Sequence, residues 1–127
     1  MSEPQPLRGV VVCHGPLAQA LVDAVESIAG VKGALVPVSN MGCDRGSLEA
    51  RVEAAVGDAP SVVFVDMASG SCLFAVLRKL RARPEVGVVT GVNLAMLLDF
   101  VFNRETSPAV ATARAVEVGA RAIGVSV

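Results

Sequence analysis

The sequence is poor in the residues that build several common kinds of binding site. Its 127 residues contain no tryptophan and no tyrosine, and aromatic residues make up 3% of the chain. Few side chains are therefore available to stack on bases. Eleven Lys and Arg residues against twelve Asp and Glu give a net charge of -1, and no block of like charge would follow a phosphate backbone. We therefore expect no nucleic-acid partner.

Long apolar runs are also lacking. Residues 1–7 are polar and contain proline, without the basic start and apolar run that are typical of a signal peptide. Elsewhere, the longest apolar runs are far too short to span a bilayer. We therefore expect a cytoplasmic protein that does not insert into a membrane.

Cysteines are few and widely separated. The three residues Cys13, Cys43 and Cys72 lie about thirty positions apart and form no C-x-x-C pair. This spacing argues against a zinc knuckle or a redox dithiol and is typical of reduced thiols.

Aliphatic residues make up for the missing aromatics. Hydrophobic residues account for 53% of the chain, and Val, Ala and Leu predominate, as in parallel sheets that helices cover on both faces. A length of 127 residues suits one domain whose core needs no disulfide or metal. Because no repeat, linker or low-complexity tract occurs, we predict a single α/β domain over residues 1–127, with residues 1–6 as a flexible tail.

Apolar segments alternate with amphipathic ones along the chain, which is the pattern of βαβ units. Strands are predicted at residues 7–13, 34–38, 61–65, 86–90 and 120–127. Helices are predicted to begin near Pro16, before Leu48, beyond Ser71, at Asn93 and at Ser107-Pro108. The first helix would end at Gly30 and bury the residues that recur at helical spacing, which are Leu17, Leu21, Ala24, Val25 and Ile28.

The only histidine of the chain, His14, follows the first predicted strand and precedes Gly15. Asp66 follows the third predicted strand, and Asn93 lies just beyond the fourth. If the strands are parallel, all three polar residues leave the sheet at its carboxyl edge. In a doubly wound sheet ordered 2-1-3-4, strands one and three are neighbours, and ligands bind where the connections diverge between them. We therefore expect His14 and Asp66 to face each other.

A carboxylate beside an imidazole accepts the proton of one ring nitrogen, which leaves the other nitrogen unprotonated and oriented. That nitrogen can attack a phosphorus atom. The loop Ser69-Gly70-Ser71 precedes a predicted helix, whose first N–H groups and positive dipole end, with the Ser71 hydroxyl, are suited to hold a phosphoryl group. Gly15 and Gly70 would let the backbone approach that group closely. These residues predict phosphoryl transfer through His14.

Other interpretations of the same residues stay open at this point. His14 can be a solvated or hydrogen-bonded histidine without a chemical role, and Asp66 can be a helix cap or a solvated carboxylate. Cys72 can join them as three ligands of an open zinc site, whereas Cys13 points to the opposite face of its strand. A hydrolase with Ser71 as nucleophile and His14 as base is a further alternative, although no triad is spelled out.

Three stretches carry a resemblance to a known family. They are His14-Gly15-x-x-Ala18, the strand ending in Asp66 with its Gly70-Ser71 loop, and Thr90-Gly91-Val92-Asn93-Leu94-Ala95-Met96-Leu97. In order and spacing they resemble the mannose-family enzyme IIA of the bacterial phosphoenolpyruvate-dependent phosphotransferase system, over nearly the whole chain. The resemblance implies a homodimer whose mainly parallel sheet, ordered 2-1-3-4, gains an antiparallel edge strand exchanged between subunits. Residues 120–127 would supply that strand.

The same resemblance implies roles for individual residues. His14 would accept phosphate from the phosphohistidine carrier HPr and pass it to a separate IIB protein for sugar uptake. Asp66 would orient the imidazole, and Ser71 would lie near the phosphoryl group; no cofactor or metal is implied. A regulatory module of the same fold, without sugar transport, is the alternative. Where the family has Gly-Gly-Ser-Pro, this chain has Ser69-Gly70-Ser71-Cys72, which places a thiol open to oxidation beside the site.

Overall fold

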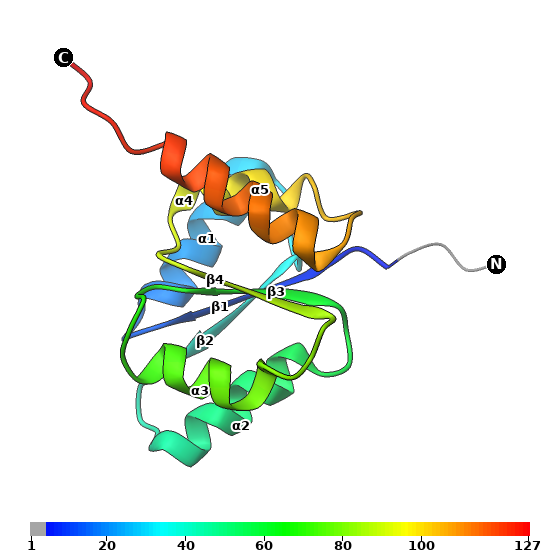
Figure 1. Ribbon diagram of the computed structural model, residues 1–127. Helices are drawn as coiled ribbons and strands as arrows, with labels where there is room; N and C mark the ends of the chain where they lie inside the picture. Colours follow the sequence, from blue (N-terminus) through cyan, green and yellow to red (C-terminus); the bar gives the residue numbers. More distant parts are fainter. Residues whose placement is uncertain (1–4) are drawn as a thin grey trace.

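Four parallel strands run through the centre of the structure, a computed structural model that describes residues 5–127 (Figure 1). They are β1 (Arg8–Cys13), β2 (Leu35–Ser39), β3 (Ser61–Val65) and β4 (Val86–Thr90), and they lie in the order β2-β1-β3-β4. The predicted doubly wound sheet and its strand order are therefore confirmed. Val12 of β1 is paired with Val65 of β3, so the chain leaves these two strands at neighbouring points of the carboxyl edge.

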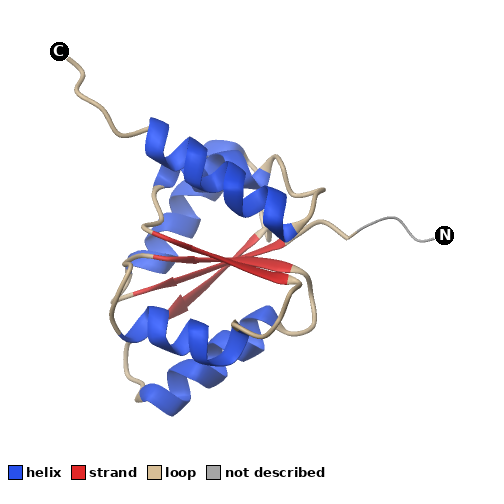
Figure 2. Cartoon of the chain, viewed as in Figure 1, coloured by secondary structure: helices blue, strands red, loops and turns tan. Residues whose placement is uncertain are grey.

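Helices cover both faces of the sheet (Figures 1 and 2). One face carries α1 (Leu17–Ala29), α4 (Leu94–Val101) and α5 (Pro108–Arg121), and the other carries α2 (Arg45–Val56) and α3 (Ser71–Leu80). Three helices begin where a side-chain oxygen accepts a hydrogen bond from an otherwise free backbone N–H. The capping residues are Asp44 for α2, Asn93 for α4 and Ser107 for α5.

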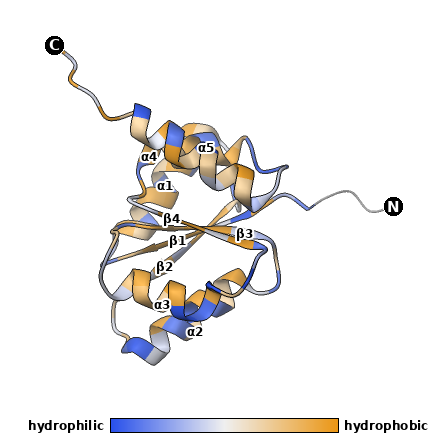
Figure 3. Cartoon of the chain, viewed as in Figure 1, coloured by the Kyte–Doolittle hydropathy of each residue, from blue (hydrophilic) through white to orange (hydrophobic). Residues whose placement is uncertain are grey.

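Successive side chains of a strand point to opposite faces of the sheet, and helices bury the side chains on both faces. Val10 and Val12 of β1 pack with α2 and α3, whereas Val11 and Cys13 pack on the side of α1, α4 and α5. The hydropathy colouring in Figure 3 shows the same arrangement, with apolar strands between helices. Cys13 is therefore a core residue, as its place in the strand predicts.

The first helix has the predicted ends but a different buried face. It stops at Gly30, whose φ of 72° suits a residue without a side chain. Ala18, Val22 and Val25 are the buried residues of α1, while Leu17 and Ile28 are exposed. The predicted burial of Leu17 and Ile28 is thus wrong. In a helix rich in small apolar residues several faces satisfy the spacing, and here the smaller side chains lie closest to the sheet.

The strand predicted at residues 120–127 does not form in the single chain. Helix α5 continues to Arg121, and residues 122–127 have no regular secondary structure. Ile123, Val125 and Val127 are exposed in this segment, which extends away from the domain (Figure 1). Because a strand needs a neighbour to satisfy its backbone groups, the segment stays unpaired in one copy of the chain. Its exchange with a second copy stays a prediction.

The N-terminal residues before β1 are only partly described. Of the predicted flexible tail, residues 1–6, the first four lie outside the described residues, and Gln5 and Pro6 are exposed. Within residues 5–127, every helix is too short or too polar to cross a bilayer.

Candidate functional site

His14 and Asp66 meet at the carboxyl edge of the sheet. His14 follows β1 directly, Asp66 follows β3 directly, and the two strands are neighbours. The imidazole Nδ1 lies 2.8 Å from Asp66 Oδ2, and the backbone N–H of His14 donates to the same oxygen at 2.9 Å. The His14 side chain is 37% exposed and that of Asp66 is 9% exposed. The two side chains thus face each other, as the sequence predicts, and the carboxylate is the more buried of the two.

The hydrogen bonds decide which nitrogen of His14 is available for chemistry. With Asp66 ionised, Nδ1 carries the proton and donates it to Oδ2, so Nε2 keeps a free lone pair. Two hydrogen bonds to one carboxylate oxygen hold both the backbone and the ring of His14. Nε2 points toward Gly70, because a Cβ built on that glycine would lie 3.4 Å from it. A nucleophilic nitrogen is therefore held next to the first turn of α3.

Helix α3 presents its N-terminus to this nitrogen. Ser71 is its first residue and is exposed, and Gly70 is the cap. The first N–H groups of a helix have no partner within it, and the helix dipole adds positive charge at the same end. An anionic group bonded to Nε2 would lie next to these free N–H groups. The predicted site residues Gly70 and Ser71 therefore lie in the same site as His14. Gly15 adjoins it with a φ of 59°, a value that favours glycine.

We expect Gly70→Ala to destabilise the protein by about 1–3 kcal/mol, because φ and ψ at this position are 94° and -178°, a region that essentially only glycine occupies. The added methyl group would only reach van der Waals contact with Nε2 and Cε1 of His14, at 3.4 and 3.5 Å, so the expected cost comes from the backbone. Urea unfolding measures the effect, with Ser69→Ala in the same exposed loop as the control. A loss of stability equal to that of the control would contradict this account of Gly70.

Two residues that the sequence did not single out hold the loop after His14. Asn40 Oδ1 accepts a hydrogen bond from the backbone N–H of Gly15 at 2.9 Å, and the hydroxyl of Ser39 donates to the carbonyl of Gly15 at 2.7 Å. Both lie at the carboxyl end of β2, the other neighbour of β1. The sequence signal that could have identified them is their position at the end of a predicted strand, since the ends of parallel strands lie at one edge of the sheet. Together they fix the backbone that carries the imidazole.

Asn93 has a structural role although it follows β4 as predicted. Its Oδ1 accepts a hydrogen bond from the backbone N–H of Met96 at 3.0 Å, and its Nδ2 donates to the carbonyl of Gly119 at 3.0 Å. The side chain therefore caps α4 and ties it to α5. These two contacts use both ends of the amide, so Asn93 contributes to packing rather than to the His14 site.

Cys72 lies beneath the site, in the first turn of α3, and is completely buried. Burial raises the pKa of its thiol to about 11, with the negative charge of Asp66 adding to the rise. The thiol is therefore protonated at neutral pH, and the expectation that it is open to oxidation is wrong. One ligand atom each from His14, Asp66 and Cys72 lie within 4.8 Å of one another. Cys13, in the opposite half of the core, is not part of this group.

A cavity of about 380 Å³ opens beside the N-terminus of α3. Gly70 and Ser71 form one wall, and Asn40, Arg45 and Phe74 contribute to the others. The Arg45 guanidinium lies 5.6 Å from the centre of the exposed Phe74 ring, a stacked arrangement that suits arginine. The site thus continues into a surface hollow that has both apolar and cationic walls.

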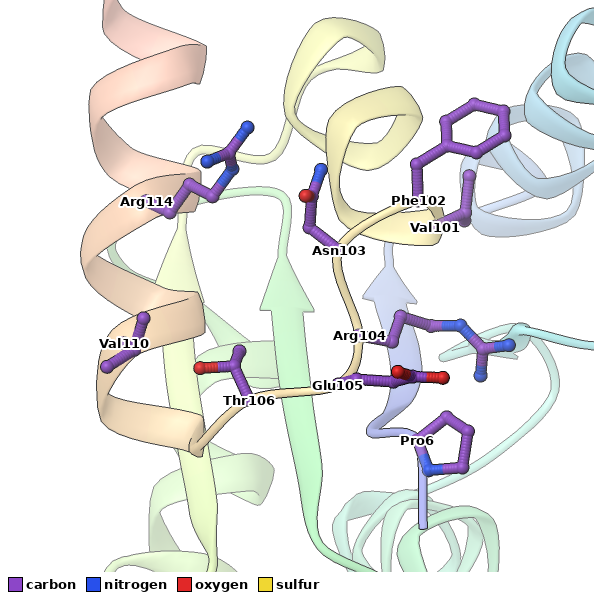
Figure 4. A pocket seen from close by; sticks show the side chains of 9 residues that line it. All are labelled: Pro6, Val101, Phe102, Asn103, Arg104, Glu105, Thr106, Val110 and Arg114. Atoms are coloured by element: carbon purple, nitrogen blue, oxygen red, sulfur yellow. The ribbon is translucent and has the colours of Figure 1, made fainter. Parts of the chain in front are cut away.

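A second pocket, of about 390 Å³, contains none of the predicted site residues (Figure 4). It is lined in part by Pro6, which precedes β1, and by the connection between α4 and α5. Both of its arginines have partners, because Arg104 donates to the carbonyl of Leu7 and Arg114 forms two bonds with Asp99. This pocket offers no unpaired cation and lies away from the carboxyl edge, so we do not place the reaction there.

Comparison with known proteins identifies a family for most of the chain. Residues 9–117 match the family model of the phosphotransferase-system (PTS) fructose IIA component, of the mannose type. These residues make up well over half of the chain and include His14, Asp66, Gly70 and Ser71. No curated protein sequence matches this chain.

Solved structures of low sequence identity share the fold. The EIIA component of the phosphotransferase system from Streptococcus agalactiae is 18% identical with a TM-score of 0.86, covering 94% of this chain and 96% of that one. The mannose/sorbose-specific IIA subunit from Enterococcus faecalis is 20% identical with a TM-score of 0.86, covering 97% and 96%. A PTS IIA protein associated with the fucose utilization operon of Streptococcus pneumoniae is 16% identical with a TM-score of 0.84, covering 98% and 96%.

Proposed function

Since the chain belongs to the mannose family of IIA components of the bacterial phosphotransferase system, we propose that His14 is the residue through which it transfers phosphate. The observation that carries this proposal is the pair of hydrogen bonds from His14 to Asp66, at 2.8 and 2.9 Å. With Asp66 ionised, these bonds orient the ring and leave Nε2 unprotonated, in a side chain that is 37% exposed. Family membership supports a phosphotransfer role, and this geometry supports the choice of residue and nitrogen.

The proposed reaction is a displacement at phosphorus. The Nε2 lone pair of His14 attacks the phosphoryl group of the phosphohistidine in HPr, and a new P–N bond forms as the old one breaks. The electron pair of the broken bond returns to the HPr imidazole. The His14 ring keeps its Nδ1 proton and gains positive charge, which the Asp66 carboxylate stabilises. In the second transfer a separate IIB protein takes the phosphoryl group, and the His14 ring returns to its neutral state.

The first turn of α3 supplies the groups that hold the phosphoryl oxygens in this proposal. Its free N–H groups and its dipole favour an anion, and Gly70 lies against Nε2 without a side chain in between. The exposed Ser71 hydroxyl adds one more donor. The negative charge of the phosphoryl group on Nε2 would thus face the N-terminus of α3. On the other side of the ring, Asp66 would stabilise the positive charge of the imidazole.

Exposed apolar residues at the same edge support docking of partner proteins. Met41 follows β2, Met67 follows β3, and Phe74 lies in α3, and all three side chains are exposed. Apolar side chains gathered around a reactive group are typical of protein interaction sites. We expect HPr and the IIB protein to use this edge in turn, because both must bring a side chain to Nε2.

A homodimer belongs to the same proposal. The segment 122–127 is unpaired and exposes Ile123, Val125 and Val127, and β4 is an edge strand of the sheet. The apolar residues of the segment alternate, which is the pattern of a strand with one buried face. Pairing with the sheet of a second copy would satisfy both the open edge and the exposed segment.

Incubation of the purified chain with phospho-HPr that carries labelled phosphate tests the function. Label should appear on the chain and then leave it when a IIB protein is added. A chain that takes up no label from phospho-HPr would overturn the proposed donor.

We expect Ser71→Ala to slow labelling by about tenfold without abolishing it, because one hydroxyl donor is lost while the backbone N–H groups of α3 remain. Initial rates of label uptake measure the effect, with Ser69→Ala as the neighbouring control. This variant also separates phosphotransfer from the hydrolase alternative. Loss of hydrolytic activity in Ser71→Ala, while His14 is still labelled at the wild-type rate, would favour a serine nucleophile instead.

A further inference from the structure

Three side chains with different ligand chemistry converge beneath the exposed face of His14. They come from separate elements: His14 follows β1, Asp66 follows β3, and Cys72 lies in α3. One ligand atom from each, drawn from an imidazole, a carboxylate and a thiol, lies within 4.8 Å of the other two. Phosphotransfer uses the imidazole and one carboxylate oxygen, so the thiol and the second carboxylate oxygen have no part in it.

The second oxygen of Asp66 is a further donor atom of this cluster that no other group among the described residues uses. Within residues 5–127, Oδ1 is buried and has no hydrogen-bond partner, and the Asp66 side chain is 9% exposed. A buried carboxylate oxygen without a partner is unfavourable because it has lost its water without compensation. The protons that Asp66 receives all go to Oδ2. A metal ion bound at Oδ1 would provide the missing partner.

The set of donor atoms selects the kind of metal. Magnesium and calcium prefer oxygen ligands alone, whereas a nitrogen, an oxygen and a sulfur together suit zinc. Around a tetrahedral zinc ion such donors lie about 3.5 Å apart, so small side-chain movements close the present arrangement. We propose that His14, Asp66 and Cys72 bind one Zn²⁺, with the fourth position open, and that this ion prevents phosphorylation of His14.

The inhibitory half of this inference rests on the proposed function. Coordination through Nε2 would occupy the atom that accepts phosphate, and coordination through Nδ1 would replace its hydrogen bond to Asp66. In either case the ion and a phosphoryl group exclude each other. The thiol releases its proton to solvent when it binds zinc, since thiolate is the metal ligand. The phosphorylated and the zinc-bound chain are therefore alternative states of one site.

Binding is tested without HPr, on the reduced chain of 127 residues. Zn²⁺ is titrated in competition with a chromogenic chelator, and we expect one ion per chain. Cys72→Ala and Asp66→Asn should each weaken binding by at least about tenfold, since even residues that only orient metal ligands contribute tenfold or more. Cys43→Ala is the matched control, because Cys43 is outside the cluster. Equal affinity in Cys72→Ala and the wild type would overturn the proposed site.

The absorption spectrum of bound Co²⁺ provides a second test of ligation by Cys72. Co²⁺ bound to a thiolate shows a charge-transfer band in the near ultraviolet, which should appear in the wild type and be absent from Cys72→Ala. Absence of the band from the wild type, or its persistence in a folded Cys72→Ala or Cys72→Ser variant, would refute ligation by Cys72. Because this readout does not involve phosphate, it holds even if HPr does not label the chain.

The functional arm compares label uptake from phospho-HPr with and without Zn²⁺. In the wild type, the rate with Zn²⁺ should be at most about one tenth of the rate without it. In Cys72→Ala the two rates should be nearly equal, whatever the basal rate of the variant. Equal zinc sensitivity in both proteins would show that zinc acts elsewhere, including on HPr. Zinc binding without any effect on labelling would contradict the inhibitory half while leaving the proposed function intact.

Discussion

His14→Ala should take up no phosphate from phospho-HPr, whereas the wild-type chain becomes labelled. The reason is that His14 is the only histidine of the sequence and its Nε2 is the free nitrogen at the carboxyl edge. The substitution should leave the fold intact, because the imidazole is 37% exposed and its removal leaves no cavity in the core. Circular dichroism and urea unfolding check this point, and label uptake is the measurement.

The chemical stability of the label makes this result specific. Phosphate on an imidazole nitrogen is lost in acid and kept in base, while phosphate on a serine hydroxyl shows the opposite behaviour. The wild-type label should therefore be acid-labile and base-stable. Persistent labelling of a folded His14→Ala chain would move the reaction to another residue, and an acid-stable label on the wild type would point to Ser71.

Asp66→Asn should slow phosphate uptake by on the order of 10²- to 10⁴-fold while the chain still folds. An asparagine has the same shape as aspartate, but it carries no charge to stabilise the imidazole as Nε2 bonds to phosphorus. Its amide oxygen can take the place of Oδ2 and accept both hydrogen bonds from His14, so the variant removes the charge while keeping the position of the ring. Initial rates at saturating phospho-HPr measure the loss, and extended incubation shows whether full labelling is still reached.

Asp58→Asn is the matched control for this experiment, since Asp58 is exposed in the turn between α2 and β3. It removes the same charge from the chain without touching the site. A rate for Asp66→Asn within twofold of that control would mean that the charge of Asp66 does not contribute to phosphate transfer. In that case the proposed stabilisation of the imidazole by Asp66 would have to be abandoned.

Much of the sheet could be predicted from the sequence because its strands are short and apolar with sharp ends. The predicted bounds of β3 and β4 are those found, since Ser61–Val65 ends at a charged residue and Val86–Thr90 ends at a glycine. Strand order then placed His14 and Asp66 side by side. The contact between them follows from topology alone, because residues leaving neighbouring parallel strands emerge at one edge.

The parts that could not be predicted depend on packing between elements or on a second chain. Helical spacing could not show that Leu17 and Ile28 would be exposed, because Ala18 and Val22 form a face of similar apolar character. Residues 120–127 are rich in residues that favour strands and are predicted to form one, yet helix α5 continues to Arg121 and the single chain offers the rest no neighbour. Asn40 was missed because its role is to bind the backbone of Gly15, a contact that leaves no spacing pattern in the sequence.

Pairing of the C-terminal segment with a second copy would make the stability of this protein depend on its concentration. If residues 122–127 pair with a second copy, part of the free energy of unfolding comes from association, and mass action then enters every stability measurement. The midpoint of thermal unfolding should rise as the chain is concentrated, and truncation after Arg121 should remove that dependence. Dilution would then leave an open edge at β4 and an apolar end in solvent, which are the conditions under which chains begin to aggregate.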